Sequence, residues 1–369
     1  MHLQEVLLNI TYVAEDFLES QILEELAEKA SQMRLSFLQH VILGNGVKPS
    51  PNSPETIRAA VADADIVVVA TSSCTVAEVI AAEEAVKLHR PLILVALGHR
   101  AWQNPDFAGV RNATRTLFVS DKEQATAAAH LFLNARIIPT GIPTYETFAF
   151  PKYTREEVRE KLGIASDHKF ILVPGDKDFT LNIPLAVCVL EALRTLPNPW
   201  SYEVILTIHP GHTPFPRQES SDELLAFYQS QFDCYNSKVH IRVSCKATPF
   251  GIGTPDMVPG ADLVIGINST VLIRAAYLRI PAIAMLLAGA FSYELPHEND
   301  GWWPPVDTGA IEGIYNMSSG ALREDIRELC NPRSGTSLMR RHFQEVAYPA
   351  PQRVGSAYEK MIADLESFE

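Results

Sequence analysis

Three short segments in the second half of the 369-residue sequence carry groups suited to binding a phosphate. Each segment directly follows an apolar run typical of a buried strand. The segments are Gly175-Asp176-Lys177-Asp178, His209-Pro210-Gly211-His212 and Gly266-Ile267-Asn268-Ser269-Thr270. In an open α/β sheet, ligands bind beyond the carboxyl ends of the strands. We therefore expect the three segments to open on one edge of a sheet and to hold an anion there.

Ser269 and Thr270 are the strongest of these candidates, with Asn268 beside them in the same turn. They begin a predicted helix, where unpaired backbone N–H groups and the positive end of the helix dipole attract an anion. Their hydroxyls add further donors to a phosphate. The alternative is that these residues only cap the helix, because every helix start needs such a group.

Lys177, His209 and His212 would add donors at the same edge. Lys177 follows Gly175 in a short turn, so its ammonium group can reach a diphosphate as a point charge, although a solvated surface lysine has the same sequence signature. The two imidazoles can donate to a phosphate or to a nucleobase carbonyl. Metal ligation is the rival interpretation, but two ligands are too few for a zinc site, so we expect no metal.

In the first half, candidates for proton transfer follow the predicted strands. His99 comes after the strand Leu92 to Leu97, and an imidazole can take a proton from an acceptor hydroxyl near neutral pH. Glu15 and Asp16 follow the first strand and are the second candidates for a base. The alternatives are a structural histidine hydrogen-bonded within its loop and two acids that stabilise the first turn of a helix.

The hydrophobic pattern predicts the scaffold that would position these groups. β-branched runs alternate with helical-period segments, which is the pattern of βαβ units. In the first half we predict strands at 5–10, 35–43, 66–70, 91–97, 116–120 and 136–139, and helices at 15–33, 54–62 and 75–89. In the second half we predict strands at 170–173, 203–208, 239–243, 263–266 and 282–286, and helices at 154–162, 183–196, 221–232 and 270–278.

The fold class that follows is α/β, with two Rossmann-like, doubly wound parallel-sheet domains facing a cleft. The first domain would span 1–143 and the second 154–340, joined by a linker over 144–153 that contains Pro151 and no helical period. A C-terminal helical segment over 341–369 would cross back, because its last helix, 355–367, is long enough to pack on the first domain.

An internal repeat supports the two-domain prediction. Ala64-Asp65 and Ala261-Asp262 each precede an apolar strand, a hydroxyl-rich turn and a helix, and in both copies a proline then opens the next strand. Helix capping alone favours Ser and Thr at such turns, so the repeated hydroxyls also have a local explanation.

Composition and charge exclude several classes. The chain is 47% hydrophobic and 20% charged, an ordinary globular composition. Its net charge of −13 repels nucleic acid and anionic lipid, so we expect no nucleic-acid partner. The five scattered cysteines lack C-x-x-C pairs, and the start lacks a secretory pattern, which predicts a cytoplasmic protein. No apolar run reaches the roughly 18 residues of a membrane-spanning helix.

Several nucleotide-binding and hydrolase motifs are missing from the sequence. No G-x-G-x-x-G follows a strand, and neither the Walker P-loop nor a G-x-S-x-G elbow is present. The two predicted halves, the linker from Ile138 through Phe148 and Pro151 to the helix Arg155–Leu162, and the final helix after Gly355 resemble the GT-B glycosyltransferase superfamily. This resemblance covers nearly the whole chain, in organisation more than in one diagnostic motif.

The resemblance implies that the second half binds a nucleotide-sugar donor, and that the first half binds the acceptor and supplies the base. His209-Pro210 and Asn268-Ser269-Thr270 are similar to the turns that hold the donor phosphates in this superfamily. No cofactor is implied, because the nucleotide sugar is a substrate. One residue departs from the pattern: many members hold the donor ribose with a glutamate where this helix has Arg274. A guanidinium cannot accept from a diol, but it can pair with a phosphate or with an acid on a solvated face.

The leading hypothesis is a metal-independent glycosyltransferase that moves a sugar from a nucleotide sugar to a small-molecule or glycan hydroxyl. Its catalytic candidates are His99, Glu15 and Asp16, and its donor-binding candidates are Gly175, Lys177, His209, His212, Asn268, Ser269, Thr270 and Arg274. One alternative is a non-hydrolysing nucleotide-sugar 2-epimerase, which the sequence also resembles through Ile208-His209-Pro210. A third is a catalytically degenerate GT-B module that serves as a binding or scaffold subunit. The sequence leaves the oligomeric state open.

Overall fold

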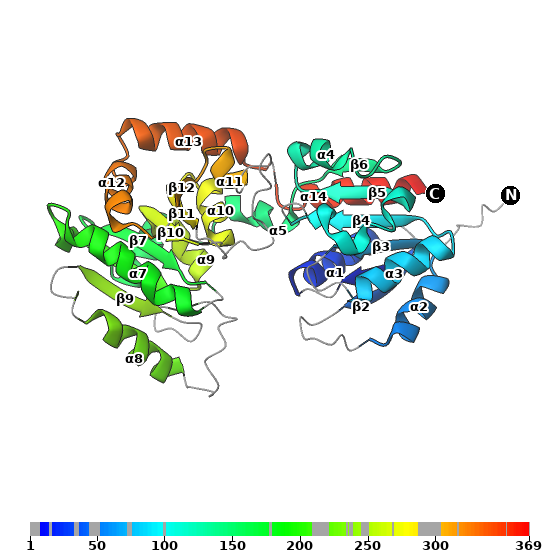
Figure 1. The fold of residues 1–369 in the computed structure, drawn as a ribbon, viewed down its shortest axis with the longest axis horizontal. Helices are drawn as coiled ribbons and strands as arrows, with labels where there is room; N and C mark the ends of the chain where they lie inside the picture. The colour runs from blue at the N-terminus through cyan, green and yellow to red at the C-terminus, as the bar shows by residue number, and fades with distance from the viewer. Residues whose placement is uncertain are drawn as a thin grey trace. The chain divides into compact units, whose positions relative to one another are not determined.

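The structure is a computed structural model, and it consists of two compact α/β units (Figure 1). One unit comprises residues 1–147 and 351–369, and the other comprises residues 148–350. The structure describes residues 8–14, 17–32, 37–43, 52–71, 76–98, 101–176, 179–208, 221–233, 235, 239–244, 251–267, 269–286, 304–315, 317–351 and 353–368.

The first unit is built on a six-stranded parallel sheet in the order β2-β1-β3-β4-β5-β6. Its strands are β1 (Leu8–Ala14), β2 (Phe37–Leu43), β3 (Ile66–Ala70), β4 (Leu92–Ala96), β5 (Thr114–Val119) and β6 (Arg136–Pro139). Its helices are α1 (Phe17–Gln32), α2 (Pro54–Ala62), α3 (Val76–Lys87), α4 (Lys122–Ala128), α5 (Pro143–Glu146) and α14 (Ser356–Leu365).

Successive side chains of these strands point to opposite faces of the sheet, and each face is covered by its own helices. Val67 and Val69 of β3 pack in the cluster that contains α2, α3 and α4, whereas Val68 packs in the cluster that contains α1 and α14. Both faces of the central strands are therefore buried, which explains why β3 and β4 are uninterrupted apolar runs.

The C-terminal helix α14 packs back on the first unit, as the sequence predicted. Its apolar face, with Tyr358, Met361 and Leu365, is buried beside α1. The carboxylate of Glu146, at the end of α5, fixes the start of α14: it accepts hydrogen bonds from the backbone N–H groups of Gly355 (2.7 Å) and Ala357 (2.8 Å) and from the Ser356 hydroxyl. An acidic group at a helix N-terminus is favoured by the helix dipole.

The second unit contains another six-stranded parallel sheet, in the order β12-β11-β10-β7-β8-β9. Its strands are β7 (Lys169–Pro174), β8 (Tyr202–Thr207), β9 (His240–Ser244), β10 (Leu263–Gly266), β11 (Ala282–Leu286) and β12 (Glu312–Tyr315). Its helices are α6 (Arg155–Leu162), α7 (Phe179–Arg194), α8 (Ser221–Phe232), α9 (Thr254–Met257), α10 (Thr270–Tyr277), α11 (Pro304–Asp307), α12 (Ser319–Leu329) and α13 (Gly335–Ala347).

Tyr277, at the end of α10, lies between two aromatic rings from the first and last parts of this unit. Its ring centroid is 6.3 Å from that of Phe148 and 5.3 Å from that of Tyr348, both in edge-on geometry. Arg279 donates a hydrogen bond to the carbonyl oxygen of Tyr348 at 3.0 Å. The residues where the chain enters and leaves this unit are thus both anchored at the end of α10.

Each unit contains the same aspartate contact at the start of a central strand. In the first unit, the backbone N–H of Asp65 donates to the Asn9 carbonyl (2.7 Å), and the Asn9 backbone N–H donates to the Asp65 carboxylate (2.9 Å). In the second unit, Asp262 and Phe170 make the same two hydrogen bonds, both at 2.8 Å. We call this reciprocal pair of hydrogen bonds the aspartate bridge. It is the structural basis of the repeated Ala-Asp in the sequence.

The helix that follows each bridged strand also ends in the same way. His89 after α3 and Arg279 after α10 have positive φ angles of 55° and 61°. In both turns the next residue donates its backbone N–H to a carbonyl five residues back, Arg90 to Ala85 and Ile280 to Ala275. These are Schellman turns, in which the left-handed position usually holds glycine. The two units therefore share a strand, helix and turn in detail.

The structure differs from the predicted elements at several places. β1 ends at Ala14, whereas the sequence predicted that the first strand would end at Ile10. The strand β12 and the helix α4 were not predicted, because each is short and lacks a clear apolar period. The predicted linker contains α5.

The C-terminal segment also divides differently from the predicted boundary at residue 341. The chain leaves the second unit at Ala350, because α13 runs without interruption from Gly335 to Ala347. Residues 341–350 thus belong to the second unit.

The Asp262 carboxylate takes part in a larger charge network than the Asp65 carboxylate does. Replacing each aspartate therefore tests how much this network adds to stability. The Asp262 carboxylate also contacts Arg155 (2.8 Å), Arg159 (3.2 Å) and Lys169 (3.6 Å). Because breaking this partly buried charge network leaves Arg159 without its carboxylate, we expect Asp262→Asn to lower the free energy of unfolding by about 2 kcal/mol. Urea denaturation of the full chain measures this loss.

Asp65→Asn is the matched control for that experiment. Asp65 is exposed, and an asparagine oxygen can still accept from Asn9, so we expect a loss of no more than about 1 kcal/mol. Equal losses for the two variants would show that the charge network around Asp262 adds nothing to stability.

Candidate functional site

The order in which successive strands are added to the second sheet reverses between β7 and β10, so that later strands extend the sheet on its other side. When its strands are numbered along the chain, their order is 3-2-1-4-5-6, with the reversal between the first and the fourth strand. In open α/β sheets ligands bind at the carboxyl edge beside this switch point. The loops that leave the sheet there begin at Gly175, after β7, and at Ile267, after β10.

Two glycines allow the ends of neighbouring strands to approach each other closely at this edge. A Cβ atom on Gly175 would lie 2.5 Å from the Thr207 carbonyl oxygen, which accepts the Gly175 backbone N–H at 2.7 Å. A Cβ atom on Gly266 would lie 3.2 Å from Cγ of Pro174, the last residue of β7. Any side chain at Gly175 would therefore displace backbone, which gives this predicted site residue a structural reason to be glycine.

The turn after Gly175 is held by a buried asparagine that the sequence analysis missed. Asn182, in the first turns of α7, is fully buried. Its Oδ1 accepts the Asp176 backbone N–H at 2.7 Å, and its Nδ2 donates to the Asp176 carbonyl at 3.4 Å and to the Tyr228 hydroxyl at 3.5 Å. Asn182 directly precedes the predicted helix 183–196, so the apolar period of that helix did not mark it.

Ser269 caps α10 directly after this edge. Its backbone is extended, with φ −139° and ψ 132°, and its Oγ accepts the Val271 backbone N–H at 3.3 Å. Ser269 is half-buried and Thr270 is exposed. The capping interpretation is therefore correct for Ser269, and it leaves the Ser269 hydroxyl proton and the Thr270 hydroxyl as donors for a ligand.

Arg274 occupies a buried position one turn further along α10. Its guanidinium carbon lies 5.3 Å from the centroid of the Phe148 ring, and its Nη2 lies 3.8 Å from Oδ1 of Asp256 in α9. Burial lowers the pKa of the Arg274 guanidinium, and the charge of Asp256 opposes that shift. The guanidinium thus has an acidic neighbour, one of the two partners that the sequence allowed.

Other predicted site residues lie outside the residues that the structure describes. These are His99, Glu15 and Asp16 of the catalytic candidates and Lys177, His209, His212 and Asn268 of the donor-binding candidates. Among the described residues, no group of three or more His, Cys, Asp or Glu side chains is arranged to hold a metal ion.

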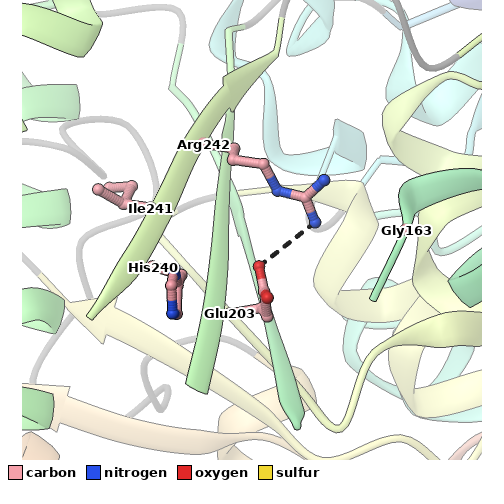
Figure 2. Close-up of a pocket in the computed structure, with 5 residues that line it drawn as sticks. All are labelled: Gly163, Glu203, His240, Ile241 and Arg242. Carbon is pink, nitrogen blue, oxygen red and sulfur yellow. Dashed lines mark ion pairs between the residues drawn. The ribbon is translucent and has the colours of Figure 1, made fainter. Parts of the chain in front are cut away.

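A pocket of about 310 Å³ lies elsewhere, lined by Gly163, Glu203, His240, Ile241 and Arg242 (Figure 2). Glu203 lies near the start of β8 and His240 begins β9, so this pocket is at the amino-terminal edge of the sheet. Arg242 forms an ion pair with Glu203 at 3.4 Å and donates a hydrogen bond to the Leu162 carbonyl. The candidate site at the switch point lies at the carboxyl edge of the sheet, so this pocket is at the opposite edge. None of the predicted site residues lines it.

Two Rossmann-like units with parallel sheets, joined so that the last helix returns to the first unit, define the GT-B fold of nucleotide-sugar enzymes. Comparison with solved structures gives the same fold. The UDP-GlcNAc 2-epimerase of Methanocaldococcus jannaschii is 16% identical, with 97% of this chain and 99% of that chain aligned at a TM-score of 0.60.

Two further neighbours carry different activities on this fold. The UDP-GlcNAc 2-epimerase of Neisseria meningitidis, solved bound to UDP-GlcNAc, is 11% identical over 97% of this chain and 100% of that chain, with a TM-score of 0.61. A glycosyltransferase from Rickettsia africae is 10% identical over 98% of both chains, with a TM-score of 0.59. At these identities the similarity establishes the fold, which hosts more than one reaction.

No protein-family model matches the sequence, and no curated protein matches it either. Within the described residues, no helix has both the length and the apolar character needed to cross a bilayer.

The close contact at Gly175 leads to a prediction on stability. We expect Gly175→Ala to lower the free energy of unfolding by about 1–3 kcal/mol, because the added methyl group meets backbone and forces the loop to move. Gly335→Ala is the control in the same unit: no atom lies within 4 Å of a Cβ there, and alanine favours the start of α13. Thermal unfolding compares the two, and equal melting temperatures would contradict the assignment of a tight turn at Gly175.

Proposed function

We propose that this chain is a metal-independent glycosyltransferase that takes its sugar from a nucleotide-sugar donor. The observation that supports this most is the position of Gly175, Ser269 and Thr270 at the carboxyl edge beside the switch point of the second sheet. The hydroxyl groups of Ser269 and Thr270 at the start of α10 suit the diphosphate of such a donor.

In the proposed mechanism, the donor phosphates bind the start of α10 through Ser269 and Thr270, with Lys177, His209, His212 and Asn268 as further donors. Charge develops on the diphosphate as the bond to the sugar breaks, and fixed N–H groups stabilise that charge without reorganisation. The acceptor hydroxyl loses its proton to a base of the first unit, for which His99, Glu15 and Asp16 are the candidates.

A 2-epimerase is the second candidate, and it is supported by the UDP-GlcNAc 2-epimerases, which are the more frequent activity among the structural neighbours. That reaction eliminates and readds the nucleotide, and it needs several carboxylates near the sugar. Asp121, an acid at the carboxyl edge of the first sheet, caps α4 by accepting the Gln124 backbone N–H (2.8 Å) and also accepts the Ser120 hydroxyl (2.7 Å). A carboxylate occupied in this way is poorly placed for proton transfer, which favours the transferase.

The donor site leads to a binding prediction. We expect one nucleotide among UDP, GDP, ADP, TDP, CDP and CMP to raise the melting temperature of the protein, because a ligand that binds only the folded state stabilises it by about 2.7 kcal/mol at a hundredfold excess over its Kd. Ser269→Ala should reduce this shift and also lower the intrinsic stability by about 1 kcal/mol through the lost cap.

Ser334→Ala separates these two effects. Ser334 caps α13 in the same manner, accepting the Ser337 backbone N–H at 3.0 Å, so its loss should lower stability and leave the nucleotide shift unchanged. If no nucleotide stabilises the parent protein, the enzymatic proposal is wrong and a binding or scaffold module explains the fold better.

A product assay separates the two enzymatic reactions. Incubated with UDP-GlcNAc alone, a transferase leaves the sugar configuration unchanged, whereas a 2-epimerase forms the manno epimer, which proton NMR detects. We expect no epimer. Its formation without any acceptor would replace the transferase with the epimerase.

A further inference from the structure

The structure describes three buried arginines, Arg159, Arg274 and Arg340, each less than one-tenth exposed. Buried guanidinium groups normally donate to protein acceptors, because each carries five N–H donors that lose their hydrogen bonds to water. Arg159 donates to the carbonyls of Gly260, Ala165 and His168 and to the carboxylate of Asp262. Arg340 donates through both terminal nitrogens, to the carbonyl of Gly309 and to Glu312.

Arg274 differs from both. In the described part of the chain its guanidinium makes no hydrogen bond. Its Nε is buried without a partner, as that of Arg340 also is, but Arg340 donates through its terminal nitrogens. The nearest acid, Asp256, lies 3.8 Å away, which is beyond hydrogen-bond distance. Phe148 packs against the guanidinium at 5.3 Å and supplies no acceptor oxygen. Arg274 is therefore a buried cation with unused donor capacity.

The two charges of this loose pair differ in their access to water. The Arg274 side chain is 10% exposed, whereas that of Asp256 is 31% exposed. Asp256 also interacts with the charge of Lys152, which is fully exposed. Asp256 can therefore turn toward solvent and keep a counter-ion, but Arg274 cannot leave its position without exposing the aromatic contact. A ligand would replace Asp256 more easily than it would displace Arg274.

The location of Arg274 on α10 places it near the candidate donor site. Long side chains of a helix lean toward its N-terminus and cover the preceding turn. The turn that precedes Arg274 contains Thr270, at the start of α10. Arg274 therefore lies one turn after the residues that the proposed function assigns to the donor.

We propose that Arg274 binds an oxyanion of the substrate, a phosphate or a carboxylate oxygen, and that the Asp256 carboxylate occupies the position of this oxyanion in the free protein. This proposal rests on the proposed function, which it deepens. When a ligand binds, its oxyanion replaces the Asp256 carboxylate as the counter-ion of Arg274. At this position the protein then recognises the donor through its negative charge and not through a hydroxyl group.

Direct binding of inorganic phosphate and UDP to the full-length protein tests the exchange, with isothermal titration at constant ionic strength. We expect Arg274→Gln to weaken binding at least tenfold, because a guanidinium bond to an oxyanion is charge-assisted. We expect Asp256→Asn to strengthen it several-fold, because the internal competitor is removed. A purely structural Arg274–Asp256 pair predicts no gain in the second variant.

Arg279→Gln is the matched control. Arg279 follows the same helix and carries the same charge, but it donates to the carbonyls of Ala276, Tyr277 and Tyr348. Its replacement should lower stability without changing affinity for phosphate or UDP. Thermal unfolding of each variant before titration establishes that it is folded.

Two nucleotide sugars that differ only in a carboxylate show whether the oxyanion belongs to the phosphate or to the sugar. If Arg274 binds a nucleotide phosphate, Arg274→Gln weakens UDP itself. If it binds a sugar carboxylate, the variant retains UDP and loses the preference of the parent for UDP-glucuronate over UDP-glucose. Unchanged affinities of Arg274→Gln for all these ligands, or weaker binding by Asp256→Asn, overturn the proposal.

The same titrations distinguish this failure from failure of the proposed function. Phosphate binding that depends on Arg274, without binding of any nucleotide, would support the oxyanion site and contradict the transferase. Normal binding of UDP by Arg274→Gln, together with an unchanged preference for UDP-glucuronate over UDP-glucose, would contradict the oxyanion site and leave the transferase supported.

Discussion

The carboxylate of Asp262 holds together the two strands on which the candidate site depends. It joins the start of β10 to the start of β7, the strands between which the sheet reverses, and it collects Arg155 and Arg159 from α6 at the same point. Because the strands are parallel, fixing their starts also sets the register of their ends, where Gly175 and Ser269 lie. The Asp65 bridge joins β1 to β3, the strands on either side of the reversal in the first sheet. Each unit thus stabilises one edge of its sheet and leaves the opposite edge available for chemistry.

Helix α10 combines several tasks that usually belong to separate elements. Its first residues form the candidate phosphate site, Arg274 provides a buried cation one turn later, and Tyr277 anchors both points at which the chain crosses between units. Six consecutive residues from Val271 to Ala276 are buried in a helix of only eight. A helix so fully packed is rigid, and this rigidity suits the binding of a charged group whose position must not change during a reaction.

Periodicity and local turn chemistry predicted most of the elements, because strands such as β3 and β10 are apolar on both faces and α2 begins with Ser53-Pro54. The Ala-Asp repeat also predicted the duplicated architecture, although the hydrogen bonds behind it became visible only in three dimensions. Short elements such as β12 escaped prediction because four residues carry too little pattern. The sequence also placed Gly175 and Ser269 correctly after the ends of β7 and β10. It could not identify Asn182 or the pairing of Arg274 with Asp256, since these depend on contacts between residues that are distant along the chain or hidden within an apolar helix.

The contacts of Glu146 and Phe148 have a consequence for motion. Glu146 is fixed to the start of α14 in one unit, and Phe148 is packed on α10 in the other, so Thr147 is the single residue between two anchored positions. On the return path, the chain from Tyr348 to Gly355 contains Pro349 and Pro351, whose rings fix φ. On the outgoing crossing, the backbone freedom between the two anchored positions is therefore confined to the dihedral angles around Thr147. A connection with so few free dihedral angles has little conformational entropy left to lose.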